Sequence, residues 1–290
     1  MPSDVSHVEN SAGRLEIAWQ EVHVWLICLS LPWFKVGQLK SALSPDEKTR
    51  ADRFRSPVDR MRFVIAHGVK RIILGSYINV EPRDLRFGCN RYGKPVLLGQ
   101  IDPYQIHFNL SHSHDIALLA VTLGLRVGVD IEFYGEANVD DLLTPEVFSQ
   151  KEMEVLHRLP ATERRQAFYN CWTKKEALAK AIGYGLAHPF QLPEFPIAPE
   201  QSADLVTMPW TQRDAHCWSL RSLNIAEAYV GALAVEGHEW ELRFLIHDSE
   251  DWAAHVSTCA QWKTFGLQFE GRGWAPVREE SAYAECVIGQ

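Results

Sequence analysis

The stretch Gly128-Val129-Asp130-Ile131-Glu132 decides how the rest of this chain is interpreted. Its alternation predicts a strand, because successive side chains of a strand point to opposite faces. Val129 and Ile131 are then directed into a core, whereas Asp130 and Glu132 share the other face. Such carboxylates suit a hard cation such as Mg²⁺, although a strand that ends in Asp-x-Glu is more often simply solvated.

A later segment brings a third carboxylate and several lysines. Apolar residues at helical spacing predict a helix from an N-cap at Thr162 to Gly183. Glu176 and Lys180 lie four residues apart at the edge of its apolar stripe, and Lys175 lies within the stripe. One interpretation of Glu176 and Lys180 is a weak ion pair on the helix surface. A metal ligand beside a phosphate-binding lysine is the functional interpretation.

The composition sets limits on function. The 290 residues are 46% hydrophobic and 23% charged, which is typical of one large or two smaller globular domains. The net charge of −8 argues against general nucleic-acid binding. Six widely spread cysteines without a CxxC pair favour reduced thiols in a cytoplasmic protein. The polar start is unlike a signal peptide, and no apolar run reaches the ~20 residues of a membrane helix.

The landmarks of the first part of the chain recur 105 residues later, which is the separation of Ser44 and Ser149. Both serines begin a Ser-x-x-Glu capping box. The offset also places Phe63 on Phe168 and Lys70 on Lys175, and the strand predicted over Val22–Ser30 on residues 127–135. We therefore expect an α+β protein whose two similar halves pack as an intramolecular pseudo-dimer.

This repeat predicts four parts: a tail (1–13), an N-terminal half (14–126), a C-terminal half with the metal site (127–236) and an extension of unassigned role (237–290). Within the N-terminal half we predict helices from Ser44 to about Phe54 and from Val58 to Tyr77. Further predicted strands and turns are Leu85–Phe87, the turn Asn90–Pro95, Ile106–Leu110, the polar turn Ser111–Asp115, Ile116–Thr122 and Gly124–Tyr134.

Two polar segments are candidates for anion binding. In Asn109-Leu110-Ser111-His112-Ser113 the histidine has the character of an ordinary loop residue, yet the serines offer hydroxyl and backbone N–H groups to an anion. The segment Lys48–Arg71 holds eight basic and two acidic residues. Most of these basic residues are expected on a solvated helix face, but in an acidic chain such a cluster can anchor a phosphate.

Four motifs, in this order, resemble those of the phosphopantetheinyl transferases of the larger, monomeric Sfp type. They are Gly93-Lys94-Pro95, Asn109 to Ser113, Gly128 to Glu132, and Trp172-Thr173-Lys174-Lys175-Glu176-Ala177-Leu178-Ala179-Lys180. The resemblance covers Val22 to Val235 and implies the two-halved 4′-phosphopantetheinyl transferase fold. It implies transfer of the phosphopantetheine arm of coenzyme A to a serine of an acyl, peptidyl or aryl carrier protein, with release of 3′,5′-ADP.

The resemblance also implies roles for individual residues. Asp130, Glu132 and Glu176 would hold Mg²⁺, Glu176 would act as the base, and Lys180 would stabilise the leaving phosphate. The residues expected to bind coenzyme A are Arg50, Arg62, Lys94, Pro95, Ser111, His112, Lys175 and Lys180. An acidic, helical apo carrier protein would dock near residues 134–159. We expect a cytoplasmic monomer that binds neither nucleic acid nor a membrane.

Three other functions compete with this interpretation. A different Mg²⁺-dependent phosphoryl or nucleotidyl enzyme needs the carboxylates but not the Asn-x-Ser-His-Ser or Trp-x-x-Lys-Glu patterns. A binding protein that kept the fold without catalysis is expected to have lost a ligand, yet the carboxylates and Lys180 are all present. A structural protein with a solvated acidic strand leaves the order of the motifs to chance.

Overall fold

The computed structural model describes residues 15–100, 105–135, 139, 148–183, 195, 204–207, 217–247, 267–270 and 273–276. The chain divides into two compact units, residues 1–247 and 248–290. In the second unit the described residues form one antiparallel pair, β11 (Leu267–Glu270) and β12 (Gly273–Pro276). All other described elements belong to the first unit.

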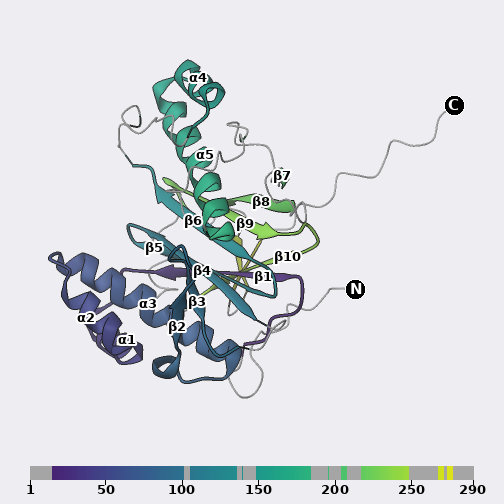
Figure 1. The fold of residues 1–290 in the computed structure, drawn as a ribbon. Coiled ribbons are helices and arrows are strands. Elements are labelled where there is room, and N and C mark those ends of the chain that lie inside the picture. The colour runs from purple at the N-terminus through teal and green to yellow at the C-terminus, as the bar shows by residue number, and fades with distance from the viewer. Residues whose placement is uncertain are drawn as a thin grey trace. The chain divides into compact units, whose positions relative to one another are not determined.

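The described residues of the first half form three α-helices, one 3₁₀ helix and five strands. In chain order its elements are β1 (Glu21–Cys28), α1 (Trp33–Ala42), α2 (Pro45–Asp52), α3 (Pro57–Ile78), the 3₁₀ helix η1 (Pro82–Asp84), β2 (Phe87–Cys89), β3 (Pro95–Leu97), β4 (Ile106–Ser113) and β5 (Ile116–Leu123). β1, β5 and β4 form an antiparallel sheet in that order. The apolar faces of β1, β5 and α3 share one hydrophobic core. Figure 1 shows the helices of this half on one side of the sheet.

The second half repeats this plan. Its elements are β6 (Val127–Phe133), α4 (Gln150–Arg158), α5 (Ala161–Ile182), β7 (Asp204–Thr207), β8 (Cys217–Asn224) and β9 (Tyr229–Glu236). The sheet has the order β6-β9-β8-β7, and α5 packs across β6, β9 and β8 (Figure 1). In both halves a first strand precedes a short capped helix, a helix of 22 residues and the antiparallel strands. The predicted α+β class is therefore confirmed, and the two halves share one order of elements.

Both predicted capping boxes form, and each leads to a buried ion pair. Ser44 and Ser149 accept the backbone N–H of Glu47 and Glu152, whose carboxylates bond back to the serine N–H. The Glu47 carboxylate also lies 3.3 Å from the Lys70 ammonium, and the Glu152 carboxylate lies 3.0 Å from that of Lys175. The repeat predicted that the two lysines are equivalent, and both bind the same member of the capping box.

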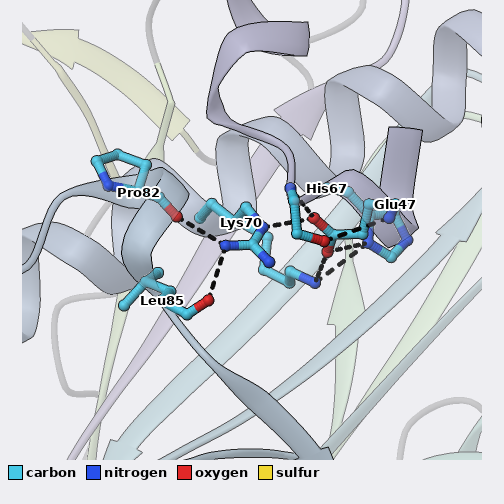
Figure 2. A network of polar contacts seen from close by, with 7 residues as sticks. Glu47, His67, Lys70, Pro82 and Leu85 are labelled. Atoms are coloured by element: carbon cyan, nitrogen blue, oxygen red, sulfur yellow. Dashed lines mark hydrogen bonds and ion pairs between the residues drawn. The ribbon is translucent and has the colours of Figure 1, made fainter. Parts of the chain in front are cut away.

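Figure 2 shows the first of these pairs with its neighbours. Glu47 also contacts His67 and accepts from the Arg71 guanidinium, which in turn donates to the carbonyls of Pro82 and Leu85. Burial alone would raise the pKa of Glu47, but the hydrogen bond with His67 and the charge of Lys70 hold it well below its ordinary value. A buried carboxylate is thus kept ionised by partners from the long helix.

Several predicted boundaries differ from the observed ones. β4 continues through Ser113, so only His114 and Asp115 of the predicted polar turn form the turn, with His114 at a φ of 50°. The prediction that Thr162 is the N-cap is wrong: α5 begins at Ala161 after Pro160, whose fixed φ suits a helix start. The strand predicted over 85–87 lies at Phe87–Cys89.

Part of the predicted C-terminal extension completes the first sheet. β10 (Glu241–Ile246) pairs in parallel with β1, and Arg243 forms an ion pair with Glu21 at 2.5 Å. The sheet order is therefore β10-β1-β5-β4, and residues up to His247 lie in the first unit. The predicted boundary at residue 236 does not separate the extension from the two halves.

Gly128 is required where α5 crosses β6. A Cβ atom there would lie 2.1 Å from the Ala177 carbonyl oxygen and 2.4 Å from the Ala181 nitrogen. We therefore expect Gly128→Ala to force the helix off the strand and lower the free energy of unfolding by about 1–3 kcal/mol or more, measured by urea denaturation. Gly37→Ala is the control, because open space surrounds that helical glycine; it is expected to raise stability by about 0.5–1 kcal/mol. Equal stability of the two variants would contradict the close approach.

The ionised Glu47 predicts a pH dependence. Because its folded pKa is lowered, its contribution to stability is complete above the unfolded pKa of about 4.3 and is lost as the pH falls below that value. Glu47→Gln should therefore flatten the fall in melting temperature below about pH 5. Asp46→Asn, in the same first turn but exposed, is the control. Parallel pH profiles of wild type and Glu47→Gln would show that the network does not hold Glu47 ionised.

Candidate active site

Side chains of β4 form hydrogen bonds with the two carboxylates of β6. Ser111 and Ser113 share one face of β4, because they are two residues apart, as Asp130 and Glu132 are on β6. The Ser111 hydroxyl donates to Asp130 Oδ1 at 2.8 Å, and the Ser113 hydroxyl donates to Glu132 Oε2 at 3.1 Å. The matched spacing lets two serines of one half bind two carboxylates of the other.

Backbone groups of β6 extend the same contact. The Asn109 side-chain oxygen accepts the N–H of Val129 at 2.8 Å, and Ser113 Oγ accepts the N–H of Phe133 at 3.0 Å. β4 and β6 are edge strands of their sheets, so their outer N–H groups need partners from elsewhere. Side chains supply these partners, and the seam between β4 and β6 joins the two halves.

Lys180 of α5 closes the site from the helix side. Its ammonium donates to Asp130 Oδ1 at 2.5 Å and to Ser111 Oγ at 3.0 Å. Asp130 is 2% exposed, and its second oxygen, Oδ2, is buried without a hydrogen-bond partner. Burial raises the pKa of Asp130, and the charge of Lys180 opposes that shift. An orphaned carboxylate oxygen is costly unless a cation or donor binds it.

The charge of Asp130 acts on the other two carboxylates, Glu132 and Glu176. Burial raises the pKa of Glu176 to about 6, with Lys180 opposing the shift and the charges of Asp130 and Glu132 adding to it. Burial and then the charge of Asp130 raise the pKa of Glu132, which accepts a hydrogen bond from Trp172. The repulsion of Glu132 and Glu176 by the charge of Asp130 is what a divalent cation would offset.

The donor set therefore fits a hard cation chemically. Within the described ranges, no three acidic, histidine or cysteine side chains are arranged as a finished metal cluster. Lys180 is instead the cation paired with Asp130. The fit rests on the unpartnered Oδ2 atom and on the raised pKa values of all three carboxylates.

Positive groups of the first half lie beside this site. His112 points away from Ser111, is exposed, and has its pKa lowered by partial desolvation and then by the charges of Lys180 and Arg62. The guanidinium of Arg62 donates to Asp115 Oδ1 through Nε at 3.2 Å and Nη2 at 2.9 Å. The charges of Lys180 and Arg62 thus both act on His112, and all three are predicted anion-binding residues.

The other predicted coenzyme-binding residues lie elsewhere. Arg50 lies over the ring of Phe63, 5.4 Å from its centroid. Pro95 is exposed at the start of β3. Lys94, half-buried, donates to two backbone carbonyls of the second half, as described below.

Lys175 does not line this site. Its side chain is 2% exposed, and its ammonium lies 3.0 Å from Glu152 and over the rings of Phe148 and Phe195. This position gives no support to the predicted contact between Lys175 and coenzyme A. The charge sits in the apolar stripe because Glu152 pairs with it, as Glu47 pairs with Lys70.

The sequence motifs include Asn109, Ser113 and Trp172, but the sequence did not predict that these residues bind β6 and its carboxylates. Asn109 and Ser113 stand in the same register as Ser111, and the period of a strand identifies them once the segment is read as strand rather than turn. Trp172 lies four residues before Glu176 on the helix face toward β6. Asp115 had no signal in the sequence, because its partner Arg62 is 53 residues away.

Known proteins share both halves of this arrangement. The 4′-phosphopantetheinyl transferase superfamily model matches residues 126–234, and the N-terminal 4′-phosphopantetheinyl transferase model matches residues 35–123. The chain belongs to the 4′-phosphopantetheinyl transferase superfamily, as the motifs predicted.

Individual relatives agree with this assignment. The 4′-phosphopantetheinyl transferase HetI of Nostoc sp. is 36% identical over 231 residues, which cover 80% of this chain and 94% of that protein. The 4′-phosphopantetheinyl transferase psf-1 of Bacillus pumilus is 34% identical over 53% of this chain and 64% of its own length. The human L-aminoadipate-semialdehyde dehydrogenase-phosphopantetheinyl transferase is 30% identical, with 54% of each chain covered.

The position of Lys175 yields a testable consequence. Lys175→Met leaves the Glu152 charge buried without its cation, so we expect a loss of about 3–5 kcal/mol in the free energy of unfolding. The double variant Lys175→Met/Glu152→Gln should recover most of this loss, because glutamine keeps an acceptor for the N–H of Phe195. Urea denaturation of both variants measures it. Lack of recovery would show that Lys175 acts through some other group.

Proposed function

We propose that this chain transfers the 4′-phosphopantetheine arm of coenzyme A to a serine hydroxyl of an apo carrier protein, releasing 3′,5′-ADP. One observation carries the proposal beyond family membership. At the seam between β4 and β6, Ser111 from one half, Asp130 from the other and Lys180 from α5 are bonded to one another. The charges of Asp130 and Glu132 raise the pKa of Glu176.

The coenzyme phosphates would bind on the positive side of the seam, which is the side formed by Lys180, His112 and Arg62. Lys180, His112 and Arg62 supply two charges and one neutral imidazole N–H, because the lowered pKa of His112 favours its neutral form. Arg50 remains a proposed outer contact, and Ser111 and the backbone at Lys94 and Pro95 are proposed to line the nucleotide pocket. Lys175 is left out of the binding set on the basis of its burial.

Asp130, Glu132 and Glu176 are the residues that would hold Mg²⁺. When bound, this ion would neutralise charge on the pyrophosphate of coenzyme A. This assignment is supported by the unpartnered Asp130 Oδ2 and by the repulsion of Glu132 and Glu176 by the charge of Asp130.

Glu176 is the proposed base. A carboxyl whose pKa is raised to about 6 by burial lies close to the working pH, where a general base is most effective. It would take the proton of the carrier serine as the serine oxygen bonds to the phosphorus of the arm. The bond from this phosphorus to the bridging oxygen breaks, and the Lys180 ammonium stabilises charge on the departing phosphate.

The carrier partner belongs to this proposal as well. An acidic, helical carrier would approach the positive side of the seam. The docking segment predicted over 134–159 lies partly outside the described residues. We also propose that the protein is a monomer and is located in the cytoplasm. None of the described helices is long and apolar enough to cross a membrane.

The decisive experiment is a mass measurement. Incubation of the protein with coenzyme A, Mg²⁺ and an apo carrier protein should add the mass of the phosphopantetheine arm to the carrier. Asp130→Ala and Glu176→Ala should each lower the transfer rate by about 10²–10⁴-fold. Asp46→Ala, exposed on α2, should retain the wild-type rate. No mass gain with several carriers would reject the function, and full activity of either site variant would reject its assigned role.

A further inference from the structure

The turn from Asn90 to Lys94 in the first half reaches the end of α5 in the second. The Lys94 ammonium donates to the carbonyl oxygens of Val127 at 2.9 Å and Ala181 at 3.2 Å. The Asn90 side-chain nitrogen donates to the Gly183 carbonyl at 3.0 Å. Two side chains of one short turn therefore bind three backbone carbonyls of the other half.

These carbonyls lack ordinary partners. Ala181 lies in the last turn of α5, where carbonyls have no N–H four residues ahead within the helix. Val127 begins β6, an edge strand whose outer carbonyls have no neighbouring strand. An ammonium with three donors can satisfy both at once, and its positive charge suits the negative end of the helix.

The turn itself is held in shape by its own side chain. Asn90 Oδ1 accepts the N–H groups of Tyr92 and Lys94, both at 2.9 Å. The packing against Gly183 is tight, because a Cβ there would lie 2.7 Å from Asn90 Nδ2 and 3.3 Å from Lys94 Cδ. Gly183 also has a φ of 83°, which favours glycine.

Lys94 acts next to the closest approach of α5 and β6. Ala181 is one of the two residues that a Cβ at Gly128 would strike, and Gly128 follows Val127 directly. Burial lowers the pKa of Lys94 to about 8, with a smaller contribution from Arg126, which itself is paired with Glu236. The Lys94 ammonium is thus largely shielded from water and donates its hydrogen bonds to the carbonyls of Val127 and Ala181.

We propose that Lys94 is a positioning residue of the transfer reaction: its side chain fastens the end of α5 to β6, and so holds Glu176 and Lys180 opposite Asp130. The inference rests on the proposed function, because the residues that it positions are the proposed base, phosphate ligand and metal ligand. It assigns the Lys94 side chain to the joint between the halves, and only the backbone of the Gly93-Lys94-Pro95 turn remains available to the nucleotide.

The kinetic test separates positioning from coenzyme binding. Lys94→Met should lower kcat by about tenfold or more, because small displacements of reacting groups are costly. The Kd of coenzyme A, measured by titration calorimetry, should stay within about twofold of wild type. Lys40→Met is the matched control, since Lys40 is exposed and its ion pair among the described residues is a surface pair with Asp52. A raised Kd with unchanged kcat would overturn the proposal in favour of a direct contact.

A second measurement does not need activity. Hydrogen exchange of the amides in residues 179–183 should be at least about tenfold faster in Lys94→Met than in Lys40→Met, while exchange in α3 stays unchanged. If Lys94→Met fails to fold, Asn90→Asp replaces it, because aspartate keeps the acceptor for the turn and loses the donor to Gly183. Unchanged exchange in residues 179–183 would overturn the proposal. An inactive wild type that still shows the exchange difference would reject the transferase function alone.

Discussion

The seam between β4 and β6 is the interaction on which the candidate site depends. Two edge strands from different sheets meet there without a shared ladder, and side chains take the place of backbone partners. The hydroxyls that hold the halves together are the same ones that orient Asp130 and Glu132. The site therefore forms only when the two halves pack together. The seam removes Asp130 and Glu132 from water, which is energetically acceptable only while Ser111 and Ser113 donate hydrogen bonds to them.

The two halves share one arrangement of strands and helices, but equivalent positions in them hold different residues. Arg71 occupies the position equivalent to Glu176, 105 residues earlier, and is bound by Glu47, Pro82 and Leu85. Trp25 stands where the second half has Asp130, and its indole donates to Tyr77. The first half has thus filled the equivalent space with internal bonds. It contributes hydroxyls and positive charges to the candidate site.

Local signals predicted well where the physics is local. Capping boxes, the long helices and the strand at Asp130 depend on neighbours within a few residues, and the structure has them close to the expected positions. The length of β4 could not be predicted, because its polar end is stabilised by β5 and by the distant β6. The repeat paired Lys175 with Lys70 and Ser149 with Ser44, but it did not predict that each lysine forms an ion pair with the glutamate of its own capping box, Glu152 or Glu47. The parallel pairing of β10 joins residues 220 apart, and no local pattern marks it.

β10 also determines the order in which the protein can be completed. β1, near the start of the chain, is bounded on one side by β5 and on the other by a strand that follows the whole second half. On the ribosome the first half therefore emerges with one flank of its sheet open, although domains usually fold as they appear. An exposed flank of this kind is a template for pairing with other chains. The nascent protein carries that hazard until β10 is made, and the rate of synthesis sets how long the exposure lasts.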